Sequence, residues 1–138
     1  MYKKITTNIV VGRVNEALDF YEQVLGFGLV MAVPEGSEQI VTARDAHTSL
    51  AFAIIQRDDV ELMLQSHESL AQDLSGLGGR PLGPSFTLYI QVADVKELYR
   101  NIKGKVTIVK DLHTTFHGAE EFWIRDGNGH VLTFAGSR

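Results

Sequence analysis

Alternating polar and apolar residues predict that the chain begins with a half-buried strand. In residues 5–11, Thr6 and Asn8 fall on one face of an extended chain, whereas Ile9 and Val11 fall on the other. A helix is predicted directly afterwards. Its apolar residues form one stripe with helical spacing, at positions 14, 17, 18, 21, 24 and 25. Gly26 supplies the C-terminal stop.

The rest of the first half is predicted to be a meander of antiparallel strands. Its segments are rich in β-branched and aromatic residues and are separated by turn residues. The predicted strands are 28–34, about 38–45, 48–56 and 60–65. Ser66 is positioned to cap a short helix at 67–74.

The same order of elements is predicted again after a glycine-rich connection at 76–84. The predicted elements are a strand at 85–92, a helix to about 102, a strand at 105–110, a polar passage at 111–118 and a hairpin at 120–135. The helix starts at Asp94-Val-Lys-Glu97, which has the pattern of a capping box. The hairpin turn is Asp126-Gly-Asn-Gly129, whose residues tolerate positive φ.

Several positions repeat between the two halves. Val11, Val14 and Glu16 recur at one constant interval as Val92, Val95 and Glu97, and Glu61 aligns with Thr133 in the two hairpins. Matching residues within a matching element order indicate an internal duplication. The sequence therefore predicts an α+β fold in which the order strand-helix-strands occurs twice, in modules 1–75 and 85–138 of one domain. The two helices differ at the N-cap. The first has Arg13 at the position that corresponds to Asp94, and arginine cannot accept hydrogen bonds from the helix N–H groups.

Composition narrows the class of protein. The chain has 138 residues, a net charge of -4 and no cysteine. A domain of this size buries roughly two-thirds of its unfolded surface and needs no disulfides. We predict a cytoplasmic protein that binds neither nucleic acid nor a membrane, because it has no basic cluster, no signal sequence and no apolar run of about 20 residues.

These features together resemble the vicinal oxygen chelate superfamily, which includes glyoxalase I, extradiol dioxygenases, fosfomycin-resistance enzymes and bleomycin-resistance proteins. The resemblance rests on Val14-x-Glu-Ala-Leu-x-Phe20-Tyr21-x-x-Val-Leu-Gly-Phe27, on Val60-Glu-Leu62, and on Phe122-x-x-x-Asp126-Gly-Asn-Gly129 followed by Leu132-Thr-Phe134. It implies that the two modules are tandem βαβββ modules, which assemble into an open, U-shaped mixed barrel that encloses a pocket. It also implies a homodimer.

The resemblance also implies where a divalent metal would be held. Enzymes of the superfamily use one ligand from the first and last strands of each module, and these positions map to Thr6, Glu61, Thr87 and Thr133. Three threonine hydroxyls do not replace the usual histidine and glutamate ligands. We therefore expect no metal cofactor and the closest similarity to the bleomycin-resistance-like branch, whose motif before the hairpin is similar to Phe116-His117-Gly118-Ala-Glu-Glu121-Phe122.

A polar and aromatic set of side chains is predicted to line the pocket. Glu61 is the candidate contact for a cationic group, or a catalytic base if the pocket raises its pKa. Trp123 and Phe122 point to opposite faces of one strand, and the sequence leaves open which of them enters the pocket. The remaining predicted ligand-binding residues are Thr6, Asn8, Met63, Thr87, Tyr89, His113, Phe116, His117 and Thr133.

Three functions follow as hypotheses. The first is a dimeric, metal-free protein that sequesters a small aromatic or cationic molecule. The second is a metal-dependent enzyme of the glyoxalase, dioxygenase or thiol-transferase type, whose divalent metal is bound by Glu61, His113 and His117. The third is an interaction module whose pocket is filled by its own side chains.

Overall fold

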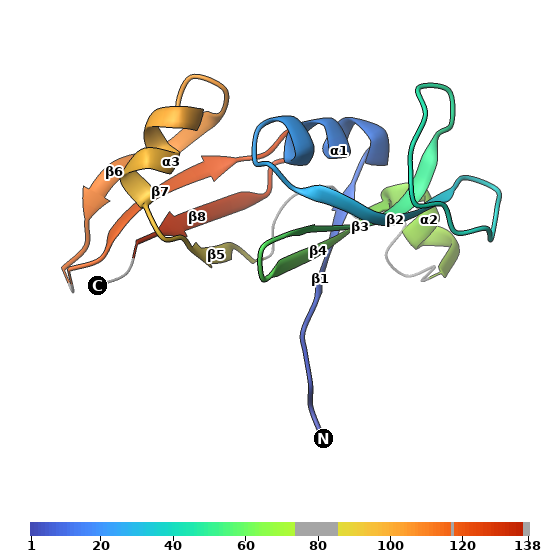
Figure 1. Ribbon diagram of the computed structural model, residues 1–138, viewed down its shortest axis with the longest axis horizontal. Helices are drawn as coiled ribbons and strands as arrows, with labels where there is room; N and C mark the ends of the chain where they lie inside the picture. The colour runs from blue at the N-terminus through green and yellow to red at the C-terminus, as the bar shows by residue number, and fades with distance from the viewer. Residues whose placement is uncertain (74–85, 117, 137–138) are drawn as a thin grey trace. The chain divides into compact units, whose positions relative to one another are not determined.

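The computed structural model describes residues 1–73, 86–116 and 118–136. The chain divides into two compact units, residues 1–82 and 83–138 (Figure 1). The predicted connection at 76–84 lies outside the described residues, so its boundaries stay a prediction.

Each unit contains one four-stranded mixed sheet. The first unit consists of β1 (Thr7–Val11), α1 (Val14–Gln23), β2 (Gly28–Pro34), β3 (Leu50–Arg57), β4 (Val60–Ser66) and α2 (His67–Asp73). The second consists of β5 (Leu88–Gln91), α3 (Val95–Ile102), β6 (Thr107–Thr114), β7 (Glu120–Arg125) and β8 (Val131–Ala135). The strand orders are β1-β4-β3-β2 and β5-β8-β7-β6, which confirms the α+β class and the tandem βαβββ modules.

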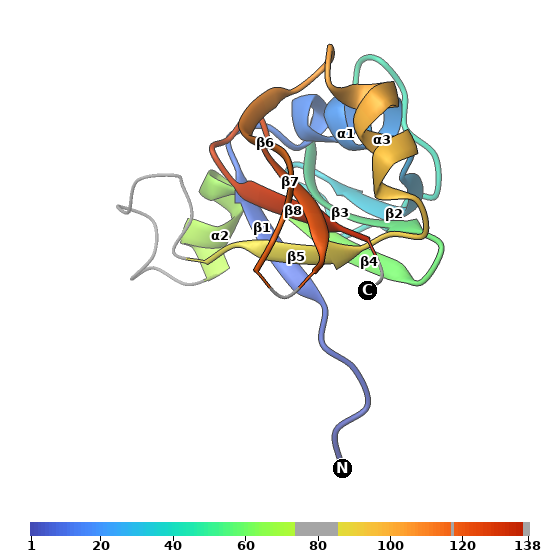
Figure 2. The same cartoon turned by 90° about the vertical axis from the view of Figure 1, so that its left-hand side faces the viewer.

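The two sheets also share their strand directions. In each, the first strand is parallel to the last, and the other pairs are antiparallel. A parallel pair cannot be joined by a tight turn, so a crossover is required between its strands. The helix in each crossover contacts one face of its sheet: α1 packs on β3 and β4, and α3 packs on β7 (Figure 2).

The predicted apolar stripe forms the core of the first unit under α1. Val14, Ala17, Leu18, Tyr21 and Leu25 are all buried. The helix ends at Gln23, and Gly26 beyond it adopts φ of +74°. There the Arg57 guanidinium donates a hydrogen bond to the Leu25 carbonyl. A Cβ at Gly26 would lie 2.7 Å from Arg57 Nη1, so glycine suits this position both sterically and conformationally.

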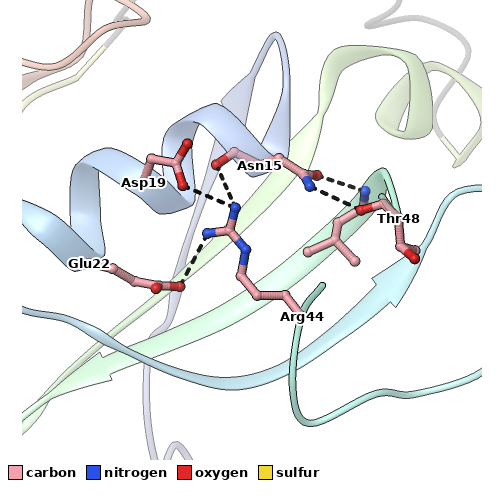
Figure 3. A network of polar contacts seen from close by, with 6 residues as sticks. Asn15, Asp19, Glu22, Arg44 and Thr48 are labelled. Carbon is pink, nitrogen blue, oxygen red and sulfur yellow. Dashed lines mark hydrogen bonds and ion pairs between the residues drawn. The ribbon is translucent and has the colours of Figure 1, made fainter. Parts of the chain in front are cut away.

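The predicted strand at about 38–45 is wrong. This segment makes only an isolated bridge between Ala32 and Val41 and otherwise runs as a loop. Side chains take over the pairing, because Arg44 donates to Asp19 Oδ1 at 3.0 Å and Asn15 Nδ2 donates to the Thr48 carbonyl at 3.0 Å (Figure 3). The loop is thereby held by α1 in addition to its single bridge to β2.

The terminal hairpin has the predicted turn. Asp126 Oδ1 accepts hydrogen bonds from the backbone N–H groups of Asn128, at 2.9 Å, and His130, at 2.8 Å, and Gly129 adopts φ of +86°. His130, directly after the turn, is buried. The hydrogen bond from the His130 backbone N–H to Asp126 holds His130 close to the turn.

Candidate functional site

The face of the first sheet opposite α1 carries four of the predicted site residues. Leu62 and Leu64 of β4 are buried in the core, so Glu61 and Met63 face the other way. Asn8 lies opposite Met63 in the parallel pairing of β1 with β4. Thr6 precedes β1 and reaches Glu61. These four predicted residues therefore share one face of one unit.

Glu61 already has two partners on this face. Thr6 Oγ1 donates to Glu61 Oε1 at 3.3 Å, and Lys4 Nζ forms an ion pair with the same oxygen at 2.9 Å. The hydrogen bond from Lys4 lowers the pKa of Glu61, against the opposing effect of partial burial. A catalytic base would need a raised pKa. The geometry instead favours an ionised carboxylate neutralised by Lys4, which the sequence analysis did not single out.

Asn8 belongs to a short polar chain that the sequence analysis also missed. Its Nδ2 donates to Gln65 Oε1 at 2.9 Å, and Gln65 Nε2 donates to Ser69 Oγ of α2 at 3.1 Å. Gln65 is buried. The Asn8 amide is thus oriented by neighbouring side chains, and its strand position was the only sequence signal for the contact.

The face of the second sheet opposite α3 is built around Trp123. Phe122 is fully buried and lies edge-on to Tyr99 of α3, with ring centroids 5.1 Å apart. Trp123 follows it on β7 and therefore points to the other face. The question that the sequence left open is answered: Trp123 lies on the candidate site face, and Phe122 lies in the core.

One row of cross-strand partners runs through Trp123. Tyr89 pairs with Thr133, Thr133 with Trp123, and Trp123 with Lys110. We expected Thr87 to match Thr133 as the first-strand position, but Thr87 lies before β5 and the register places Tyr89 opposite Thr133. Thr87, which corresponds to Thr6 by the repeat interval, therefore does not lie opposite Thr133, which corresponds to Glu61.

The next row contains a buried carboxylate. Glu121 is 7% exposed, and its Oε1 accepts a hydrogen bond from Trp123 Nε1 at 3.2 Å. His113 pairs with Glu121 across the strands, and its Nε2 lies 3.8 Å from the same oxygen. Strand alternation puts Glu121 and Trp123 on one face, and this was the signal that could have found Glu121.

A hydrogen bond at Nδ1 fixes the orientation of the His113 ring. Its Nδ1 lies 2.7 Å from the backbone carbonyl oxygen of Asp111, which can only accept, so Nδ1 carries the proton. The Asp111 side chain in turn accepts from the Tyr99 hydroxyl at 2.8 Å, and this hydrogen bond raises the pKa of Tyr99. In neutral His113, Nε2 is consequently a hydrogen-bond acceptor directed toward Glu121.

Trp123 is surrounded by polar groups that hold its ring. Lys110 Nζ lies 5.1 Å from the centre of the indole, and the His113 ring meets it edge-on at 6.3 Å. The side chain is half-buried. A fixed aromatic surface flanked by a cation and a carboxylate suits contact with a planar or charged organic molecule.

One predicted residue lies away from this arrangement, and another is not among the described residues. Phe116 is fully exposed on the loop after β6, so it does not line the face around Trp123. His117 is not among the described residues, and a site that pairs it with His113 stays a prediction.

The side chains present do not fit the superfamily's usual metal site. Across residues 1–73, 86–116 and 118–136, no three histidine, aspartate or glutamate side chains come together in a way that could hold a metal ion. Thr6 uses its hydroxyl as a donor to Glu61, which is opposite to what a metal ligand requires. Within the same residues, no helix has the length and apolar character to cross a membrane.

The folded modules and the Trp123 face define a protein of the βαβββ type with a polar aromatic site. The matching family model is the Glyoxalase/Bleomycin resistance protein/Dioxygenase superfamily, over residues 5–134. The chain belongs to this superfamily.

Solved structures share the fold at low sequence identity. A protein of unknown function from Agrobacterium tumefaciens is 18% identical, with a TM-score of 0.76 and coverage of 100% of this chain and 96% of its own. TioX from Micromonospora sp. ML1 is 17% identical, with a TM-score of 0.69 and 98% coverage of both chains. A superfamily member from Sphaerobacter thermophilus is 18% identical, with a TM-score of 0.72 and coverage of 99% and 98%. No curated protein matches the sequence.

Proposed function

We propose that the chain is a metal-free, small-molecule binding protein of the bleomycin-resistance-like branch, with Trp123 as the surface on which an aromatic part of the ligand stacks. The observation that carries this proposal is the fixed indole. Its Nε1 is tied to the buried Glu121, so the ring loses little further freedom when a ligand binds. Binding of this kind requires neither a base nor a metal.

The lowered pKa of Glu61 also supports binding over turnover. A carboxylate that is ionised and paired with Lys4 can contact a cationic group only by exchanging partners. The predicted contact between Glu61 and a ligand cation therefore belongs to the same proposal as an electrostatic role, and no proton transfer is assigned to it.

The test uses the chain's single tryptophan, which makes intrinsic fluorescence a direct report on this face. A thermal-shift screen of aromatic antibiotics and glutathione adducts should find compounds that raise the unfolding temperature, because a ligand that binds only the native state stabilises it. The same compounds should change Trp123 emission. Trp123→Ala should abolish the shift, Trp123→Phe should retain part of it, and Ile40→Ser on the exposed loop should leave it unchanged. Stabilising compounds that act equally on Trp123→Ala would refute the proposal.

The metal-dependent alternative is separated by elemental analysis. Protein purified without chelator should contain no stoichiometric Mn, Fe, Ni or Zn. Bound metal that disappears in the double variant His113→Ala, His117→Ala would favour the enzyme instead.

We further propose a homodimer. Phe86 and Tyr89 are 49% and 55% exposed, beside a strand at the edge of its sheet, and large exposed apolar side chains there suit an interface. Light scattering after size exclusion should give twice the chain mass of 15.3 kDa. A monomer at every concentration would contradict this part of the proposal alone.

A further inference from the structure

We propose that the ligand of the Trp123 face is an organic ammonium linked to an aromatic group, and that in the free protein the Lys110 ammonium lies over the indole face that the aromatic group covers. This inference rests on the proposed function, because it names the chemical class of molecule that binds there. It is based on the charged and hydrogen-bonding groups around Glu121, because packing in the core of the second unit does not account for a carboxylate at this position.

Glu121 has no lysine or arginine as a counter-ion among the described residues. A buried carboxylate is normally paired with a positive charge, because its removal from water is costly. In the described part of the chain, no lysine or arginine forms an ion pair with Glu121. His113 is the only side chain there that can carry a positive charge and lies close to its carboxylate. Its sequence neighbour Glu120 is more exposed and nevertheless pairs with Lys96 at 3.5 Å. The less accessible of the two carboxylates is therefore the one without a permanent cation.

The second step concerns hydrogen-bonding capacity. Trp123 Nε1 and His113 Nε2 both approach Oε1 of Glu121, so Oε2 is the atom that remains for a further donor. With the proton of His113 on Nδ1, its Nε2 is also an acceptor. Two acceptors thus lie side by side at one edge of the indole. A primary ammonium, which has three donors and no acceptor, matches this pair.

The third step concerns the face of the ring. Lys110 Nζ lies 5.1 Å from the centre of Trp123, at a distance typical of a cation–π contact. Lys110 itself is exposed, and such contacts are weak at exposed positions. A ligand ammonium that also reaches Glu121 makes stronger contacts than Lys110, so it displaces the lysine while its aromatic group covers the indole.

The experiment compares two probes of nearly equal size, phenethylamine and 2-phenylethanol, by titration of Trp123 fluorescence in the full chain. The charged probe should bind at least 10-fold more tightly than the neutral one. Glu121→Gln should remove this preference, with no change for 2-phenylethanol. Equal affinity of the two probes for the native protein would overturn the inference and leave the proposed function intact, whereas failure of both probes, and of every aromatic compound in the screen, would remove the proposed function itself.

A second variant keeps the inference testable if Glu121→Gln does not fold. Lys110→Met removes the competing cation, so phenethylamine should bind several-fold more tightly while 2-phenylethanol changes little. Lys105→Met is the matched control, because Lys105 is an exposed lysine of the same unit that makes no contact with the indole. An unchanged or weaker affinity of Lys110→Met for phenethylamine would show that Lys110 does not compete with the ligand at the indole.

Discussion

The two units have the same fold but treat a carboxylate on the equivalent sheet face in opposite ways. Glu61 is half-buried, and Lys4 neutralises it at 2.9 Å. Glu121 is buried and receives a hydrogen bond from an indole, and among the described residues only the imidazole of His113 lies within ion-pair distance of it. The comparison indicates that duplication preserved the scaffold while the chemistry of the two faces diverged. The second face is the one left with unsatisfied capacity for a ligand.

The aromatic pair on β7 gives the largest expected effect. Phe122→Ala should cost about 3–5 kcal/mol in the free energy of unfolding, because it empties a fully buried position between Tyr99 and Phe134. Trp123→Ala should cost clearly less, since the ring is only half-buried. Urea denaturation of both variants measures the difference. Equal losses would mean that Trp123 belongs to the core and that the site face is wrongly assigned.

The two hairpin turns should differ by a smaller amount. Asp126→Ala should cost about 1–3 kcal/mol, because two backbone N–H groups lose their acceptor, one of them at the buried His130. Asp58 in the first hairpin has a positive φ of 52° and an exposed side chain, so Asp58→Gly should change stability by no more than about 0.5 kcal/mol. Thermal unfolding checks both, and Asp126→Asn, which keeps an acceptor oxygen, serves as the control. A larger effect at Asp58 would reverse the proposed order.

The helix caps provide the third comparison. Asp94 Oδ1 accepts from the Glu97 N–H at 3.1 Å, whereas Arg13 caps α1 without a side-chain hydrogen bond. Asp94→Ala should therefore cost about 1 kcal/mol, and Arg13→Asp should gain a similar or smaller amount. Thermal unfolding of each variant measures the change, with Arg13→Ala as the control for loss of charge alone. A loss of stability in Arg13→Asp would show that Arg13 has a contact more valuable than a cap.

Most elements of this fold could be predicted from the sequence, because apolar and polar residues alternate with a clear period in each half. The stripe under α1, the Asp94 cap and the terminal turn are local patterns, and local backbone preferences decide them. The position of the two aromatic residues could not be predicted, because Phe122 and Trp123 are adjacent and similarly apolar. Only the packing of Tyr99 of α3 against Phe122 chooses between them.

The site was harder to predict because its contacts depend on register and on long side chains. The pairing of Tyr89 with Thr133 follows from how β5 lies on β8, which no interval between repeats specifies. Lys4 and Lys110 carry no motif, yet each lies against a predicted site residue, Glu61 or Trp123. The strand expected at about 38–45 failed for a related reason, since Arg44 pairs with side chains of α1.

The smallest effect separates the electrostatics of Glu61 from those of Glu121. Lys4→Met should raise the pKa of Glu61 toward its ordinary value of 4.5, because the hydrogen bond from Lys4 is the main cause of the lowered value. A lowered folded-state pKa contributes stability above the unfolded-state value, and this contribution is lost as the pH falls through the folded-state pKa. The native protein should therefore lose more stability than Lys4→Met on acidification from pH 6 to about pH 3. NMR titration of the Glu61 carboxyl measures the shift directly, with Lys3→Met as the control. If the Glu61 titration is the same in all three proteins, Lys4 does not neutralise it, and the first face would be as open to a ligand cation as the second.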